Sequence, residues 1–156
     1  MAGFLAGIGL ETVPCVFAEH GFRGFLDGLA IHGGVLLIHE PRLTWPGDLL
    51  HEAGHLAVVP AGKREQLSGS AGSDPGEEMA AIAWSYAAAL YLEIDPAIVF
   101  HSGGYQGGSR AILENFSQGR YFGVPLLEWL GLTADKKNAA VLKVPPYPHM
   151  LKWLTE

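Results

Sequence analysis

The segment from Met79 to Leu92 constrains the fold most strongly, because its 14 residues carry no charge and almost all are apolar. Just before it, Asp74-Pro75-Gly76-Glu77 has the residue types of a helix start, with Asp as the N-cap and Pro at the first helical position. A helix that is apolar on nearly every face must be surrounded by other elements. A bilayer-spanning helix needs about 20 residues. The sequence therefore predicts a central, buried helix and no membrane association.

Other elements are predicted around this helix. The apolar run over 34–39 is rich in β-branched residues and stops at Glu40-Pro41, so it predicts a strand. A helix is predicted over 48–59, where Pro60 ends it. The other expected elements are a short helix from Asp95 to near His101, helices over about 109–118 and 124–129, an extended surface segment over 144–148 and a terminal helical turn over 150–154. Together they predict a compact α+β fold, mainly helical with a small β-sheet.

Charge and composition exclude several classes of protein. The chain has 16 Asp+Glu against 10 Lys+Arg and no long basic cluster, so nucleic acid is not an expected partner. With 49% hydrophobic residues and no linker-like tract, residues 1–156 are expected to form a single domain with its own core. The apolar N-terminus has no Lys or Arg before its hydrophobic run and does not resemble a signal peptide. We therefore expect a cytoplasmic protein.

The segment His51-Glu52-Ala53-Gly54-His55 indicates the chemistry. On the predicted helix, His51 and His55 are separated by about 400° of rotation, so both imidazoles project from one face, one turn apart. Two neutral imidazoles placed in this way can hold one metal ion. Glu52 lies about 100° around the helix from His51, where it can reach a water molecule on that ion. This arrangement is the physical basis of the HExxH zinc motif, in which the glutamate is the general base.

A catalytic zinc site usually has three protein ligands and one open position. No histidine follows His55 at the spacing of the longer metzincin motif, which excludes that class. The third ligand is therefore expected from the second helix, where Glu77 and Glu78 stand in the first turn. Glu77 occupies the capping-box position, so its carboxylate has a structural role and Glu78 is the favoured ligand. Glu77, His101 and His39 are the alternatives.

The segment over 34–92 resembles the gluzincin group of zinc metallopeptidases, in which a strand, an HExxH helix and a second helix with a glutamate follow one another. It is partly similar to the ImmA/IrrE-type peptidases of bacteria, whose second helix carries Glu, then Ala three residues later, then an aromatic residue. Glu78, Ala81 and Trp84 match this pattern, while Ile82 stands where the pattern has Asn. The chain has no helix-turn-helix module, so the resemblance does not imply a regulatory role on DNA.

The resemblance implies a minimal zincin-like domain that holds Zn²⁺ through His51, His55 and a glutamate. It also implies Glu52 as general base and acid, and hydrolysis of a peptide or protein substrate. By the same analogy, the strand Val35–Ile38 is the sheet edge that pairs with an extended substrate.

A hydrolase also needs a donor to the oxyanion that develops on the substrate. The candidates are His101, Tyr105 and Arg110, in a stretch whose four glycines allow the backbone to come near a ligand. This stretch lacks the Lys-Ser/Thr of a phosphate-binding loop. It is either a turn-rich connector or a loop that lines the substrate site.

The favoured interpretation is a zinc-dependent hydrolase, a small metallopeptidase with Glu52, His101 and Tyr105 as catalytic residues. Two other interpretations stay open. One is a non-catalytic metal-binding or interaction protein on a peptidase-like scaffold, and the other is a hydrolase of non-peptidic amides or esters. Two imidazoles and a carboxylate also suit Mn²⁺, Fe²⁺ and Ni²⁺.

Overall fold

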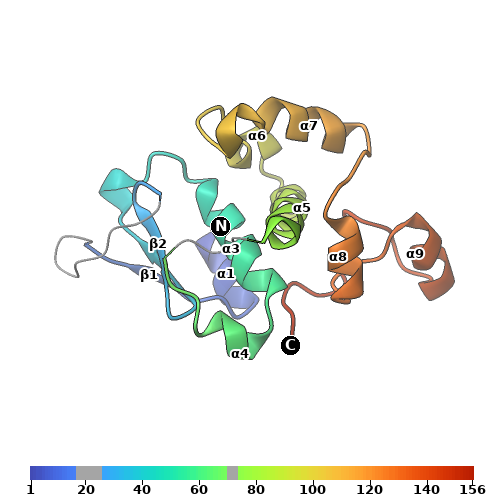
Figure 1. Ribbon diagram of the computed structural model, residues 1–156, viewed down its shortest axis with the longest axis horizontal. Coiled ribbons are helices and arrows are strands. Elements are labelled where there is room, and N and C mark those ends of the chain that lie inside the picture. Colours follow the sequence, from blue (N-terminus) through green and yellow to red (C-terminus); the bar gives the residue numbers. More distant parts are fainter. Residues whose placement is uncertain (17–25, 70–73) are drawn as a thin grey trace.

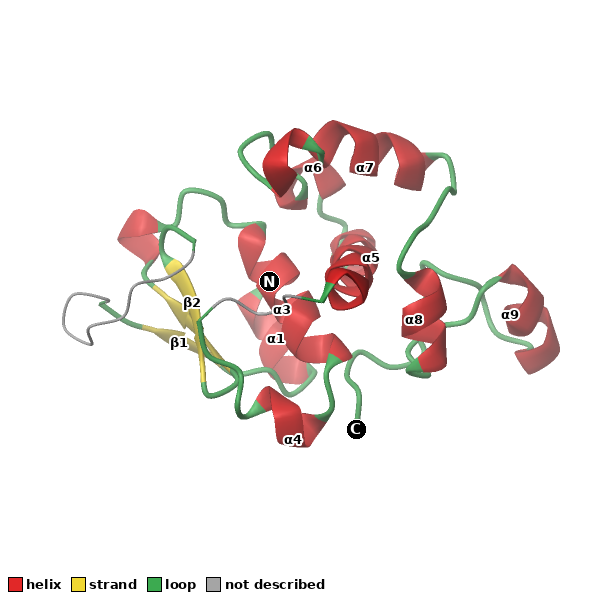
Figure 2. Ribbon diagram, in the orientation of Figure 1, coloured by secondary structure: helices red, strands yellow, loops and turns green. Residues whose placement is uncertain are grey.

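The computed structural model describes residues 1–16, 26–69 and 74–156. Within these ranges the chain forms eight helices and a small three-stranded mixed sheet. Figure 2 shows the strands together on one side of the molecule and the helices making up the rest. The predicted α+β class is confirmed.

The elements have the following bounds. The strands are β1 (Thr12–Pro14), β2 (Leu29–His32) and β3 (Val35–Ile38). The helices are α1 (Ala2–Gly7), α3 (Asp48–Val58), α4 (Ala61–Arg64), α5 (Pro75–Tyr91), α6 (Pro96–Val99), α7 (Ser109–Ser117), α8 (Val124–Trp129) and α9 (Lys136–Leu142). Two 3-10 turns cover Glu40–Arg42 and Tyr105–Gly107. The strand and the five helices predicted ahead of residue 130 are present, with α6 ending two residues before His101.

Helix α5 forms the centre of the core. Its residues 80–89 are buried without interruption, and α3, α6 and α8 pack around it (Figure 1). Asp74 caps the helix by accepting hydrogen bonds from the N–H groups of Gly76 and Glu77 at 2.6 and 3.2 Å, and Pro75 takes the first helical position. The predicted central helix is confirmed. Among the described residues, none of the helices has the length and apolar character needed to cross a bilayer.

The sheet has the strand order β1-β3-β2, with β1 parallel and β2 antiparallel to β3. The β2–β3 hairpin turns at Gly33 and Gly34, whose φ angles of 58° and 77° belong to a type I′ turn that favours glycine. Strand β3 (Val35–Ile38) is therefore the central strand. The expectation that it is a free edge for a substrate is wrong, because β1, from the N-terminal segment, pairs with its second side.

The C-terminal segment also differs from the sequence prediction. Residues 150–154 form no helical turn, and the Leu151 N–H donates instead to the Leu132 carbonyl at 2.8 Å. Tyr147 is only 5% exposed, and its hydroxyl donates to the Ala83 carbonyl in α5 at 2.9 Å. The proline-rich segment therefore enters the core at Tyr147 instead of lying wholly on the surface, because a buried hydroxyl is satisfied there by the central helix.

Arg64 ties the end of α3 to the C-terminal tail. Its guanidinium donates to the carbonyl oxygens of Leu56 at 2.8 Å, Val59 at 3.2 Å and Thr155 at 2.9 Å. The last carbonyls of a helix have no partners within that helix. One side chain thus satisfies carbonyls at the end of α3 and holds the final residues of the chain against it.

Candidate metal centre

Helix α3 presents His51 and His55 on one face, as their spacing predicts. Their Nε2 atoms lie 3.2 Å apart, and the rings meet edge to face with centroids 4.8 Å apart. His55 is buried and His51 is partly buried, because this face of α3 packs against α5. The two imidazoles therefore point at one place between the two helices.

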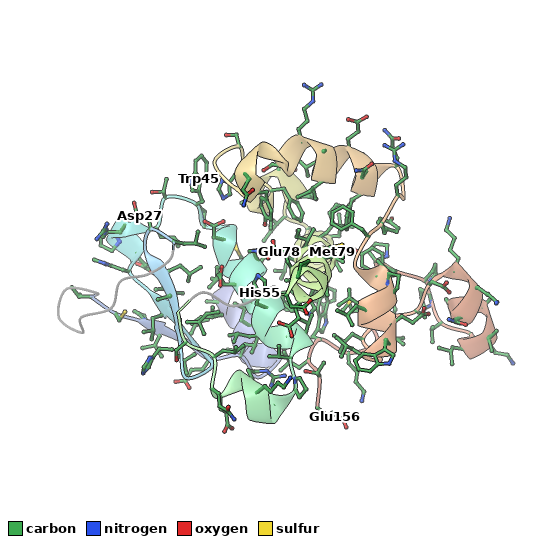
Figure 3. All side chains as sticks on the ribbon, in the orientation of Figure 1. Asp27, Trp45, His55, Glu78, Met79 and Glu156 are labelled. Carbon is green, nitrogen blue, oxygen red and sulfur yellow. The ribbon has the colours of Figure 1, made fainter. Side chains whose placement is uncertain are left out.

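The first turn of α5 brings a carboxylate to the same place. Glu78 Oε2 lies 3.1 Å from Nε2 of His55, and Oε1 lies 3.6 Å from Nε2 of His51. Figure 3 shows His55 and Glu78 next to each other where α3 and α5 meet. Ligand atoms of His51, His55 and Glu78 all lie within 4.8 Å of one another. Among the described residues, Glu77, His39 and His101 are not part of this group.

The separations within this group fit a metal ion. Ligand atoms bound at about 2.0–2.1 Å to a tetrahedral Zn²⁺ lie about 3.3 Å apart. The two Nε2 atoms lie 3.2 Å apart, one Glu78 oxygen lies 3.1 Å from His55 and the other lies 3.6 Å from His51. Burial, followed by the nearby His55, lowers the pKa of His51 to about 4, which leaves this ring neutral at neutral pH. The hydrogen bond from His55 lowers the pKa of Glu78 below its ordinary value. Neutral imidazole and ionised carboxylate are the states that bind metal, so the group could hold a divalent ion.

Glu52 is buried beside this group and lines the same cleft. Burial raises the pKa of Glu52 to about 7, and the Asp48 and Glu78 carboxylates add to this effect while His55 opposes it. A carboxyl group whose pKa lies near neutrality can both accept and return a proton. The position of Glu52, between the two histidines in sequence and within the cleft, suits general acid–base chemistry.

The cleft has a volume of about 710 Å³, which is enough for a small ligand or a few residues of a peptide. All three members of the histidine–glutamate group line it, together with side chains from α5 and from the loop over 101–106. Arg110, the third candidate for an oxyanion donor, is exposed on α7 and does not line the cleft. Of the three sequence candidates, the structure brings His101 and Tyr105 to the cleft.

Tyr105 covers one side of the centre. Its ring meets that of His51 edge to face, with centroids 5.1 Å apart. In the described part of the chain, the Tyr105 hydroxyl is buried and has no hydrogen-bond partner. Burial, then the carboxylates of Asp48, Glu78 and Glu52, raises the pKa of Tyr105 above its ordinary value. The phenol therefore keeps its proton and can donate it in a hydrogen bond.

His101 has a different environment. Its ring lies 2.8 Å, through Nε2, from Oδ1 of Asp48, and its Nδ1 accepts the Gly103 N–H at 3.2 Å. Trp45 stacks on the ring with centroids 4.2 Å apart and planes within 6°. Both nitrogens of His101 are thus already engaged with the protein.

The sequence analysis did not single out Asp48 or assign Trp45 to the site. Asp48 stands one helical turn before His51, so the periodicity of α3 alone would have placed it near the motif. No sequence pattern links it to His101, 53 residues away. Trp45, 40% exposed, lines the cleft on the same side, and its position follows only from the fold.

Comparisons with protein-family models, with curated proteins and with solved structures find no match to this chain.

Proposed function

We propose that this protein is a zinc-dependent hydrolase that cleaves peptide bonds. The observation that carries the proposal is the convergence of His51, His55 and Glu78 at separations suited to one ion, on the wall of a cleft open to a substrate. The buried carboxyl of Glu52 in the same cleft supplies the acid–base group that hydrolysis needs.

Each residue of the site has a separate task in this proposal. His51, His55 and Glu78 hold the ion, and a bound Zn²⁺ supplies Lewis acidity that polarises a carbonyl and acidifies water. The Glu52 carboxylate accepts a proton from the attacking water and returns it to the leaving nitrogen. The Tyr105 hydroxyl donates a hydrogen bond to the substrate's carbonyl oxygen as charge develops there.

The composition of the site favours an enzyme over a non-catalytic metal-binding protein. Structural zinc sites are usually closed by four protein ligands, whereas catalytic sites keep one position open. Within the described ranges, no fourth His, Cys, Asp or Glu joins His51, His55 and Glu78. An incomplete ligand set on the wall of a cleft is the arrangement that catalysis requires.

Two measurements test the proposal in sequence. Elemental analysis of protein purified without added metal should give about one zinc per chain, and His51→Ala combined with His55→Ala should remove it. Hydrolysis is then assayed with a library of internally quenched fluorescent peptides. Glu52→Gln should keep the zinc and lower the rate by at least about 1,000-fold, as expected for loss of the general base.

The matched control is Glu77→Gln, the same substitution at a glutamate outside the metal group. It should retain both zinc and activity. Stoichiometric zinc with no hydrolysis of any peptide, in a protein that cleaves amide or ester probes, would instead favour the non-peptidic hydrolase. Stoichiometric zinc with no hydrolysis of either kind would favour the non-catalytic alternative.

A further inference from the structure

The loop that carries Tyr105 adopts a backbone conformation that needs support from its surroundings. Tyr105 and Gln106 have φ angles of 54° and 51°, and Gly107 follows at 84°. Left-handed conformations are unfavourable for residues with a side chain, and they persist where neighbouring contacts impose them. The position of the Tyr105 ring therefore depends on whatever holds this loop in place.

His101 connects the loop to helix α3. Because the Gly103 N–H donates to Nδ1, that nitrogen carries no proton, so the ring proton is on Nε2 and is donated to Oδ1 of Asp48. Asp48 is the first residue of α3, one turn before His51. At the other end of the loop, the buried Ser109 hydroxyl donates to the His101 carbonyl at 2.6 Å. The imidazole thus bridges the metal-binding helix and the loop backbone.

Two of the four glycines in the loop, Gly103 and Gly104, fit closely against aromatic rings. A Cβ on Gly103 would lie 3.1 Å from atoms of the Trp45 indole, and one on Gly104 would lie 3.1 Å from the His101 ring. Such distances are closer than side chains normally tolerate, so the backbone rests directly on the stacked Trp45–His101 pair. This contact fixes the path of the chain into Tyr105.

His101 and Tyr105 have different roles, because both ring nitrogens of His101 are hydrogen-bonded within the protein. His101 has no free N–H to offer a substrate, because its one ring proton is donated to Asp48. Tyr105 has a buried hydroxyl without a partner among the described residues, on a ring that contacts His51. Tyr105 is one of the residues that line the cleft, and a buried donor without a partner is costly unless a ligand uses it.

We propose that Asp48 and His101 are positioning residues: they hold the loop so that the Tyr105 hydroxyl stands beside the metal centre as the donor to the substrate's carbonyl oxygen. This inference rests on the proposed function, and it assigns to His101 an action through Tyr105 instead of one on the substrate. Variants can remove the two hydrogen bonds of the His101 ring, one with Asp48 and one with Gly103.

The test measures binding of acetohydroxamate to the zinc-loaded protein by isothermal titration calorimetry, so it needs no known substrate. The oxygens of this probe bind zinc and accept hydrogen bonds. Tyr105→Phe should weaken binding about tenfold, the effect of one lost hydrogen bond to a charged acceptor. His101→Ala should weaken it to a similar extent, and His101→Ala with Tyr105→Phe should be no weaker than Tyr105→Phe alone.

Asp48 provides a second, milder pair of variants in case removal of the buried ring unfolds the protein. Asp48→Ala should weaken acetohydroxamate as Tyr105→Phe does, while Asp48→Asn, which keeps an oxygen acceptor for His101, should recover most of the affinity. Hydrogen exchange of the metal-free protein gives an independent readout, because Asp48→Ala should speed exchange of the amides over 103–108. His149→Gln, at an exposed histidine outside the cleft, is the control and should change neither measurement.

The outcomes separate this inference from the proposed function. If the wild-type protein binds no zinc, the metal centre itself is wrong. If zinc and acetohydroxamate bind but the His101 and Tyr105 effects are additive, or the Asp48 variants bind as the wild type does, the positioning role is wrong and the metal centre stands.

Discussion

Gly54 lies directly against Ala81, so that a Cβ added to Gly54 would stand 2.8 Å from the Ala81 carbonyl oxygen. Gly54 is inside the HExxH segment of α3, and Ala81 is one turn after Glu78 on α5. The absence of a side chain at Gly54 allows the two backbones to approach closely enough for Glu78 to reach both histidines. The helix that carries two ligands and the helix that carries the third therefore meet at a glycine.

Gly54→Ala should destabilise the protein and weaken zinc binding. The added methyl group meets backbone, which cannot rotate away, and overpacking of this kind costs about 1–3 kcal/mol. The gain in helix propensity from Gly to Ala is about 1 kcal/mol and does not offset the upper part of that range. Urea unfolding should show a lower free energy of unfolding, and zinc titration a lower affinity, because α5 must move away from α3.

Gly62→Ala is the matched control for that variant. Gly62 lies in α4, and a Cβ there meets nothing within 4 Å. This substitution should leave stability unchanged or slightly increased and zinc affinity unchanged. An equal loss of stability in both variants would show that the Gly54–Ala81 contact is not what limits the approach of the helices.

The fold could be predicted where local signals agree with burial. The Asp74-Pro75 cap and the uninterrupted apolar run are sufficient to locate α5, and Pro60 marks the end of α3. Gly33-Gly34 was an equally clear local signal, because paired glycines between apolar runs favour a type I′ hairpin, and it would have revealed β2. The edge position assigned to Val35–Ile38 was wrong because the partner β1 is a three-residue strand, too short to be identified from sequence.

For the site too, short-range sequence patterns predicted residue positions, whereas contacts between residues far apart in the sequence could not be predicted. The spacing of His51 and His55 fixes their common face, and the capping argument favours Glu78 over Glu77 by elimination. The structure then brings Glu78 to the two rings, although among the described residues the Glu77 carboxylate accepts no hydrogen bond from the N–H of the cap residue Asp74. The Asp48–His101 bond joins positions 53 residues apart, and no periodicity within one helix contains that information.

Glu78→Gln should reduce zinc affinity strongly, while Glu77→Gln should not. Replacing the carboxylate removes a charged ligand near His51 and His55, whereas Glu77 lies outside the group. Ligand binding to the folded state stabilises it, by about 2.7 kcal/mol when free zinc is 100 times the dissociation constant. Thermal unfolding with and without zinc should therefore show a large shift for the wild type and Glu77→Gln, and a small one for Glu78→Gln. Equal shifts in both variants would remove Glu78 from the ligand set.

Arg64→Ala should destabilise the fold by about 2–3 kcal/mol, because it leaves carbonyls at the end of α3 and one in the C-terminal tail without their charged donor. Lys63→Ala is the control, since Lys63 is the preceding residue of α4 and is exposed. Urea unfolding should separate the two variants clearly. If both variants lose the same small free energy of unfolding, the hydrogen bonds of Arg64 contribute no more to stability than the exposed side chain of Lys63.

The charge of the cleft predicts which peptides are cleaved fastest. Five carboxylate residues line it, and the residues that line it in the described structure include no Lys or Arg. The lining carboxylates are Asp27, Asp48, Glu52, Asp74 and Glu78. A single sign of charge in a cleft raises the local concentration of oppositely charged ligands, and salt screens the effect. Arg42, paired with Asp27 at 2.8 Å, offsets one of the five charges, and a bound divalent ion would offset two more, so the cleft keeps a net negative charge.

Paired fluorogenic peptides that differ by one Lys→Glu replacement near the cleaved bond measure this preference. At about 20 mM salt the Lys peptide should have a kcat/KM at least about 10-fold higher, and the ratio should fall several-fold at about 0.5 M salt, where the Debye length is only a few ångströms. Asp74→Ser, which keeps a helix-capping side chain while removing one charge, should lower the ratio without removing zinc. A ratio near one that does not respond to salt would mean that uncharged contacts in the cleft select the substrate, since electrostatic attraction on this scale cannot be independent of ionic strength.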